Sequence, residues 1–146
     1  MMNIHTMNRV GLILVGMALS LSAGGARADV VVVVSAKSPV TALSKNQIVD
    51  IFLGKSNRFP DGRPAVPIDQ VEGSAVRDEF YREYADKSPA QIKAYWSKII
   101  FTGRGAPPQE VDNGLAMKKR IIAHPDDIGY IDRDMVDGSV KVVGTP

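Results

Sequence analysis

The sequence contains no cysteine, and its 146 residues include only two histidines. The missing thiols exclude disulfide bonds, thiolate catalysis and cysteine-ligated metal sites. His124 directly precedes Pro125 at an expected helix end, where a cation beside the last carbonyls is a common structural choice. Metal sites usually need several imidazole ligands, and a catalytic triad would have to use the ring of His124, the one histidine after residue 28. We therefore expect no metal, no cofactor and no enzymatic activity.

Long hydrophobic runs are also scarce, and the one long run lies near the N-terminus. Arg9 precedes an apolar stretch over residues 10–24, and the small-residue pattern Ala-Arg-Ala follows it. These features are typical of a secretory signal peptide. We therefore expect residues 1–28 to be removed and the mature chain to begin at Asp29 in the periplasm. The alternative is an uncleaved anchor, although the run is shorter than the roughly 20 residues of a spanning helix.

The expected mature chain has no excess of charge of one sign. The whole sequence has a formal net charge of +2, and Arg9 and Arg27 account for it, so residues 29–146 carry equal numbers of basic and acidic side chains. A neutral domain has no general attraction for nucleic acids or membrane surfaces. Any attraction for an anion must therefore be local.

Residues 29–146 have the length of one small domain, and no repeat, low-complexity tract or linker divides them. The β-branched run over 29–36 does not alternate between polar and apolar residues, which is typical of a strand covered on both faces. Residues 66–69 predict a second strand. Residues 127–131 and 140–143 predict two more, the last one after an Asp-Gly turn.

Four helices are predicted between these strands. A capping-box pattern begins the first helix at Ser44, and serine also precedes the second at Ser74 and the third at Ser88. The fourth is expected from about Gln109 to Ala123. The residues expected to face the core are Ile48, Ile51, Phe52, Val76, Phe80, Tyr84, Ile92, Trp96, Ile99, Ile100, Val111, Leu115 and Ile122. Strands that alternate with helices predict an α/β layer arrangement with a mostly parallel sheet.

The stretch VEGSAVRDEF, residues 71–80, joins the second predicted strand to the second predicted helix. The first N–H groups of a helix lack intrahelical partners, and the peptide dipoles add partial positive charge there. Gly73 lets the backbone approach a ligand closely, and the Ser74 hydroxyl can donate to an anion. The N–H groups of Ala75 and Val76 can point the same way, so the junction predicts an oxyanion site. The alternative is that Ser74 serves only as an N-cap.

Arg77 adds to the prediction of an anion site. Arg82 has acids four residues away on both sides, Asp78 and Asp86, and helix-surface ion pairs explain it. Arg77 has no such neighbours. Its side chain should lean toward the start of the helix, where a guanidinium can bind two oxygens of one anion. The alternative for Arg77 is an ion pair with Glu72.

Several segments together resemble a known family. LSKNQIVDIFLGK (43–55) is followed by a proline-containing strand, by EGSAVRDEF (72–80), by YW (95–96), and by DIGYID before a GSVKVV strand. In this order they are similar to the phosphate-type periplasmic solute-binding proteins of ABC transporters, especially to short members with about one lobe of sequence. The resemblance implies a three-layer single lobe of a type II periplasmic-binding-protein-like fold, with about four to five strands and four helices.

In full-length members of this family, the motif Arg-x-x-Gly-Ser-Gly-Thr binds phosphate in a cleft between two lobes. Gly73 and Ser74 match the motif, whereas Gln70 stands where the arginine belongs. Ala75 and Val76 replace the second glycine and the threonine. The resemblance therefore implies that the backbone donors are kept while one charge and one hydroxyl are lost, with Gln70 as an additional candidate ligand.

These observations lead us to expect an exported, non-enzymatic domain that binds phosphate or a related oxyanion weakly, for ABC-type transport or sensing. A homodimer, or a partner that covers the exposed site, would replace the wall that a second lobe provides. The resemblance implies an ABC permease, a membrane sensor or an envelope protein as partner, and we expect no nucleic acid. The alternative is a periplasmic interaction module that kept the fold and lost the ligand.

Overall fold

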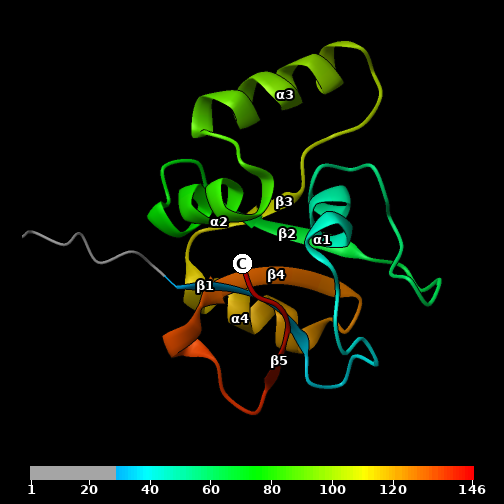
Figure 1. Ribbon diagram of the computed structural model, residues 1–146, viewed down its shortest axis with the longest axis vertical. Coiled ribbons are helices and arrows are strands. Elements are labelled where there is room, and N and C mark those ends of the chain that lie inside the picture. The colour runs from blue at the N-terminus through cyan, green and yellow to red at the C-terminus, as the bar shows by residue number, and fades with distance from the viewer. Residues whose placement is uncertain (1–28) are drawn as a thin grey trace, which may run out of the picture.

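The computed structural model describes residues 29–146, so the expected signal peptide over residues 1–28 lies outside the described residues. Strands and helices alternate along most of this part of the chain (Figure 1). Their order is β1 (Val30–Ser35), α1 (Lys45–Phe52), β2 (Val66–Gln70), α2 (Ala75–Ala85), α3 (Pro89–Phe101), β3 (Gln109–Val111), α4 (Gly114–Ala123), β4 (Asp127–Asp132), a short 3-10 helix (Arg133–Met135) and β5 (Val140–Gly144). No helix in residues 29–146 combines the length and the apolar character needed to cross a membrane.

The five strands form one sheet in the order β3-β2-β4-β1-β5. The α/β class, the strand number and the four helices are confirmed, and the sheet is mixed, with four strands in one direction and β1 in the opposite one. β2 runs parallel to β3 and β4, whereas β1 lies between β4 and β5 and runs antiparallel to both. Burial on both faces indicates that β1 is an inner strand, which it is, but hydrophobicity carries no information on strand direction.

The core has one part on each face of the sheet. Val30, Val32 and Val34 of β1 pack with side chains of α1, α2 and α3. Val31 and Val33 face the other way and pack with Met117 and Ile121 of α4, among others. Successive strand residues point to opposite faces, so one run of valines serves both cores. Figure 1 shows the resulting three layers, with α4 on the opposite side of the sheet from α1 and α2.

The predicted helix starts are confirmed by their caps. Ser44 forms a complete capping box with Gln47, and Ser88 forms another with Gln91. Ser74 caps α2, because its side chain accepts a hydrogen bond from the N–H of Arg77. These contacts span three residues, which explains why a local sequence pattern was sufficient to predict them.

The fourth helix starts later than expected. Residues Gln109–Val111 form the edge strand β3, and α4 begins at Gly114 after an asparagine cap. Two residues assigned to its core face are wrong, since Leu115 is 56% exposed and Ile122 is 40% exposed. In α3, Ile92 and Trp96 are buried as expected, Ile99 is partly buried, and Ile100 is exposed.

Candidate functional site

The junction between β2 and α2 lies at the carboxyl end of a strand that runs parallel to both of its neighbours. Gly73 adopts φ +93°, a left-handed conformation that glycine accepts readily, and a Cβ placed there would meet nothing within 4 Å. Ser74 then takes an extended conformation and α2 begins at Ala75. The chain therefore turns from strand to helix over four residues, 71–74, and leaves open space around Gly73.

The Ser74 hydroxyl already has two protein partners. It accepts from the N–H of Arg77 at 3.2 Å and donates to Oε1 of Gln70 at 2.9 Å. The Ser74 N–H donates to the carbonyl of Val71 at 3.1 Å. An anion that used the hydroxyl would therefore have to displace Gln70.

Gln70 is 2% exposed and ties the loop to the centre of the sheet. Its Nε2 donates to the carbonyl of Tyr130 at 3.3 Å, and its backbone N–H lies 3.0 Å from the Tyr130 hydroxyl. The amide carbonyl is the group that faces Ser74. The side chain at this position thus presents an acceptor to Ser74, where the arginine of the related motif would present donors.

Arg77 is directed into the protein interior. Only 7% of the residue is exposed, and its Nε lies 3.4 Å from Oδ1 of Asp69, while its guanidinium carbon lies 5.3 Å from the centre of the Tyr81 ring. The alternative pairing with Glu72 is wrong, because Glu72 pairs with Lys93 at 3.3 Å. A carboxylate of the protein therefore already lies against this guanidinium.

Asp69 is the residue of this region that the sequence analysis missed. It is 2% exposed and accepts from the Tyr81 hydroxyl at 2.6 Å and from the Tyr130 hydroxyl. An acidic residue at the end of a buried strand was the available signal, since a buried charge needs partners. With Arg77 it forms a buried cluster, the Asp69 cluster, defined as Asp69, Arg77, Tyr81 and Tyr130.

Burial and the charge of Asp69 shift the pKa values of Tyr81, Tyr130 and Arg77. Burial raises the pKa of Tyr81 and of Tyr130, and the negative charge of Asp69 raises both further. For Arg77, burial alone would lower the pKa, but the attraction of Asp69 is the chief opposing effect and the pKa is raised overall. Both tyrosines therefore remain neutral donors and Arg77 remains a cation.

Two backbone donors at the start of α2 remain available. The N–H groups of Ala75 and Val76 have no hydrogen-bond acceptor among residues 29–146. Ala75 is exposed, and Val76 is partly exposed. The helix dipole makes this end partly positive, so these two N–H groups can bind an oxyanion.

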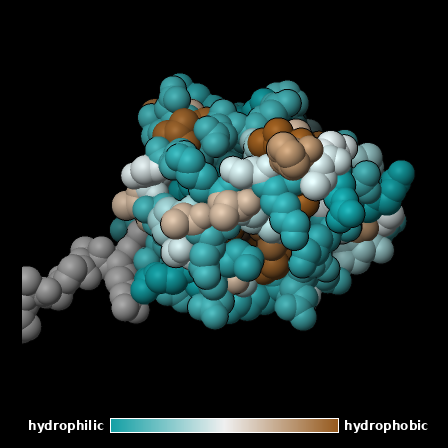
Figure 2. Space-filling model, turned by 90° about the horizontal axis from the view of Figure 1, so that it is seen from above, coloured by the Kyte–Doolittle hydropathy of each residue, from teal (hydrophilic) through white to brown (hydrophobic). Residues whose placement is uncertain are grey.

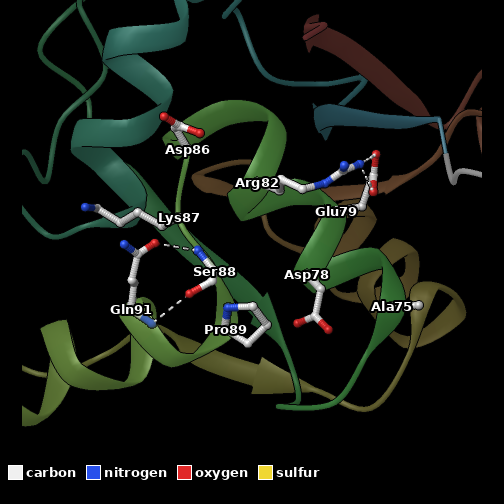
Figure 3. Close-up of a pocket in the computed structure, with 9 residues that line it drawn as sticks. All are labelled: Ala75, Asp78, Glu79, Arg82, Asp86, Lys87, Ser88, Pro89 and Gln91. Atoms are coloured by element: carbon white, nitrogen blue, oxygen red, sulfur yellow. Dashed lines mark hydrogen bonds and ion pairs between the residues drawn. The ribbon is translucent and has the colours of Figure 1, made fainter.

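The cavity beside this helix start is lined by three acids, Asp78, Glu79 and Asp86, and two bases, Arg82 and Lys87. It has a volume of about 450 Å³ and lies between α2 and the start of α3, with Ala75 at its edge (Figure 3). Asp78 points into it, and one Asp78 oxygen is buried without a partner among the described residues. Arg82 binds Glu79 and Glu83 rather than the predicted Asp78 and Asp86. The Asp78 carboxylate therefore makes this side of the helix start less favourable for an anion.

No protein-family model matches the chain, and no curated protein matches it. Among solved structures, it is similar to a Clostridium perfringens protein described as a phosphate ABC transporter substrate-binding protein with bound phosphate, with a TM-score of 0.64 and 24% identity. An ABC-type phosphate transport receptor from Vibrio cholerae gives a TM-score of 0.63 and 20% identity. The PstS protein of Borrelia burgdorferi gives 0.53 and 15%. The chain has the fold of these phosphate-transport proteins.

The similarity covers 80% of this chain but only 44%, 45% and 47% of the three proteins. The chain therefore spans less than half the length of the phosphate-transport proteins that it matches. At these identities the comparison establishes the fold, including the single mixed sheet with helices on both faces. The predicted anion-binding residues, Gly73, Ser74, Ala75, Val76 and Arg77 with Gln70, stay a prediction.

Proposed function

We propose that residues 29–146 form an exported solute-binding-protein-like domain that binds phosphate or a related oxyanion weakly, for ABC-type transport or sensing. One observation carries the proposal. The free N–H groups of Ala75 and Val76 lie beside open space at Gly73, at the carboxyl end of a parallel strand. Helix starts in this position favour anions because donors and dipole act together.

Binding is expected to be weak because few donors are available. The Ser74 hydroxyl donates to Gln70, and Arg77 pairs with Asp69. Each missing charge-assisted hydrogen bond weakens binding by roughly 1.5–3 kcal/mol, or about one to two powers of ten in Kd. A homodimer or a partner such as an ABC permease could supply further donors over the exposed junction.

A second candidate is a periplasmic interaction module that kept the fold and lost the ligand. The internal partners of Ser74 and Arg77 favour it, because both side chains have hydrogen-bonding or ionic partners without a ligand. In that case the domain would dock on a membrane sensor, a transporter or an envelope assembly. Its junction would then be structural, with Ser74 acting only as the cap of α2.

Calorimetric titration of residues 29–146 with phosphate, sulfate and acetate separates the two candidates. Ala75→Pro removes one free N–H while keeping α2, because proline is well accepted at the first position of a helix. We expect this variant to weaken phosphate binding about tenfold. Ser74→Ala should weaken it less, because the Ser74 hydroxyl donates to Gln70. Ser44→Ala removes a comparable cap from α1 and should leave the affinity unchanged.

The proposal of anion binding is overturned if the wild-type domain shows no heat and no thermal stabilisation at millimolar phosphate. That result would favour the interaction module. If Ala75→Pro binds phosphate as tightly as the wild type, the assignment of the site to the β2–α2 junction is overturned. Thermal unfolding of each variant should show that α2 is intact, so that a lost affinity is not mistaken for a lost fold.

A further inference from the structure

The C-terminal end of α3 exposes two large hydrophobic side chains. Ile100 is 56% exposed and Phe101 is 92% exposed, the highest value among the exposed large hydrophobic residues. The same helix is held to the domain by Ile92 and Trp96, which are both buried. Figure 1 shows α3 as the outermost element on the α1 and α2 side, and Figure 2, which looks onto that side, shows hydrophobic groups among hydrophilic ones.

The segment that contains α3 and the loop after it is basic. Residues 87–109 contain four basic side chains and no acidic one, although residues 29–146 as a whole are balanced. Two acids from other segments, Glu72 and Glu110, line a pocket together with Ile100, and Glu72 pairs with Lys93. Lys98 and Arg104 are exposed, and neither makes an ion pair within the described part of the chain. We call Lys98, Ile100, Phe101 and Arg104 the α3 tip. It combines apolar groups with unpaired positive charge.

The carbonyls of Lys98, Ile99 and Ile100 near the end of α3 are already hydrogen-bonded. The N–H of Arg104 donates to the carbonyl of Ile99 and that of Gly103 to the carbonyl of Ile100, both at 3.1 Å. Gly103 has φ +67°, which completes the paired cap usual at helix C-termini. The Thr102 hydroxyl also donates to the carbonyl of Lys98 at 3.0 Å. These carbonyls can therefore enter a less polar layer without losing partners.

We propose that the α3 tip docks the domain on an anionic phospholipid surface. Ile100 and Phe101 enter the boundary between headgroups and acyl chains, while Lys98 and Arg104 pair with lipid phosphates. The tip is the end of an outermost helix. Such an end suits insertion into a lipid layer better than it suits binding in the groove of a partner protein. A second copy is disfavoured, because a symmetric contact would bring the cations of two tips together.

This inference is independent of the proposed anion site, since it uses no residue of the β2–α2 junction. Docking through α3 would leave the Asp69 cluster and the helix start at Ala75 unchanged. Failure of phosphate binding would therefore say nothing against lipid binding. Conversely, loss of lipid binding in a variant of the α3 tip should leave the phosphate titration unchanged.

Vesicle co-sedimentation of residues 29–146 tests the proposal, because this part holds the whole described sheet and its helices. Vesicles of phosphatidylcholine alone are compared with vesicles that also contain phosphatidylglycerol. We expect binding only to the anionic vesicles, with the partition coefficient reduced about tenfold or more by Ile100→Ser with Phe101→Ser. Lys98→Gln with Arg104→Gln should give a similar loss, and so should high salt.

The matched control lies on α4. Leu115 has the same exposed fraction as Ile100, 56%, and Lys119 is an exposed lysine four residues further along. Leu115→Ser with Lys119→Gln should leave vesicle binding unchanged. Equal losses in the control and in the tip variants would mean nonspecific adsorption and would overturn the proposal.

A fluorescence measurement tests insertion directly. The protein contains one tryptophan, and Trp96 is 6% exposed. Brominated lipids should quench a new emission in Phe101→Trp and leave the wild-type Trp96 emission unchanged. The proposal is overturned if vesicles are not bound, if neutral and anionic vesicles bind alike, or if position 101 is not quenched. Concentration-dependent dimerisation that the tip variants abolish, without vesicle binding, would assign the tip to a second copy instead.

Discussion

The Nε of Arg77 lies 3.4 Å from Oδ1 of Asp69, and both side chains are almost completely buried. The two residues stand at the start of α2 and the end of β2, so their ion pair fixes the helix against the strand beside the candidate anion site. The Tyr81 and Tyr130 hydroxyls donate to the same carboxylate. The cation that could have bound an external anion is thus held by an internal one.

Removal of the Asp69 charge should therefore destabilise the protein strongly. Asp69→Asn leaves the Arg77 cation buried without its counter-charge, and we expect the free energy of unfolding to fall by about 3–5 kcal/mol. Urea denaturation monitored by circular dichroism measures this change. Glu72→Gln breaks the exposed pair with Lys93 and should cost less than about 1 kcal/mol. Similar losses in both variants would contradict the structural role of the Asp69 cluster.

Alkaline pH should destabilise the fold through the tyrosines. The pKa values of Tyr81 and Tyr130 are raised by burial and by Asp69, above the value of about 10 of an unfolded tyrosine. Their contribution to stability is therefore fully present below about pH 10 and is lost as the pH rises toward the folded-state pKa values. Each group should lower the free energy of unfolding by about 1.4 kcal/mol per pH unit in that range.

Phenolate absorbance and circular dichroism, recorded together during an alkaline titration, check this expectation. The phenolates of Tyr81 and Tyr130 should form only as the helical signal is lost. Ionisation of all tyrosines near pH 10 in a protein that remains folded would show that these hydroxyls are accessible to water. A denaturant series at several pH values gives the slope independently.

The two hydrophobic faces of α4 should respond differently to truncation. Met117→Ala removes a side chain with 0% exposure from the core and should lower the free energy of unfolding by about 2–5 kcal/mol. Leu115→Ala changes a side chain that is 56% exposed and should change it by less than about 0.5 kcal/mol. Thermal or urea unfolding measures both. A larger loss for Leu115→Ala would mean that this face of α4 is covered in solution.

The buried face of α4 also could not be predicted from the sequence. Leu115 and Ile122 are seven residues apart, whereas Met117 and Ile121 are four apart, so both pairs are compatible with a buried helical stripe. The sheet decided between them, because Val31 and Val33 of β1 pack on the Met117 and Ile121 side. Nothing within the helix itself distinguishes the two faces.

The candidate site divides in the same way. The Gly-Ser helix start was predictable because Ser74 caps a residue three positions away. The partner of Arg77 was not, because the choice between Glu72, Asp69 and an external anion depends on how α2 lies on β2. The Gln70 carbonyl likewise faces Ser74 only because its amide is tied to Tyr130 on the neighbouring strand.

The sequence by itself determined the features that depend on contacts within a few residues: the helix starts at Ser44, Ser74 and Ser88, and the doubly buried run of β1. Tertiary structure alone decided the antiparallel direction of β1, the buried face of α4 and the internal partner of Arg77. The physical reason is that capping energies are local. Strand direction, burial and ion pairing depend instead on groups brought together only when the sheet has formed.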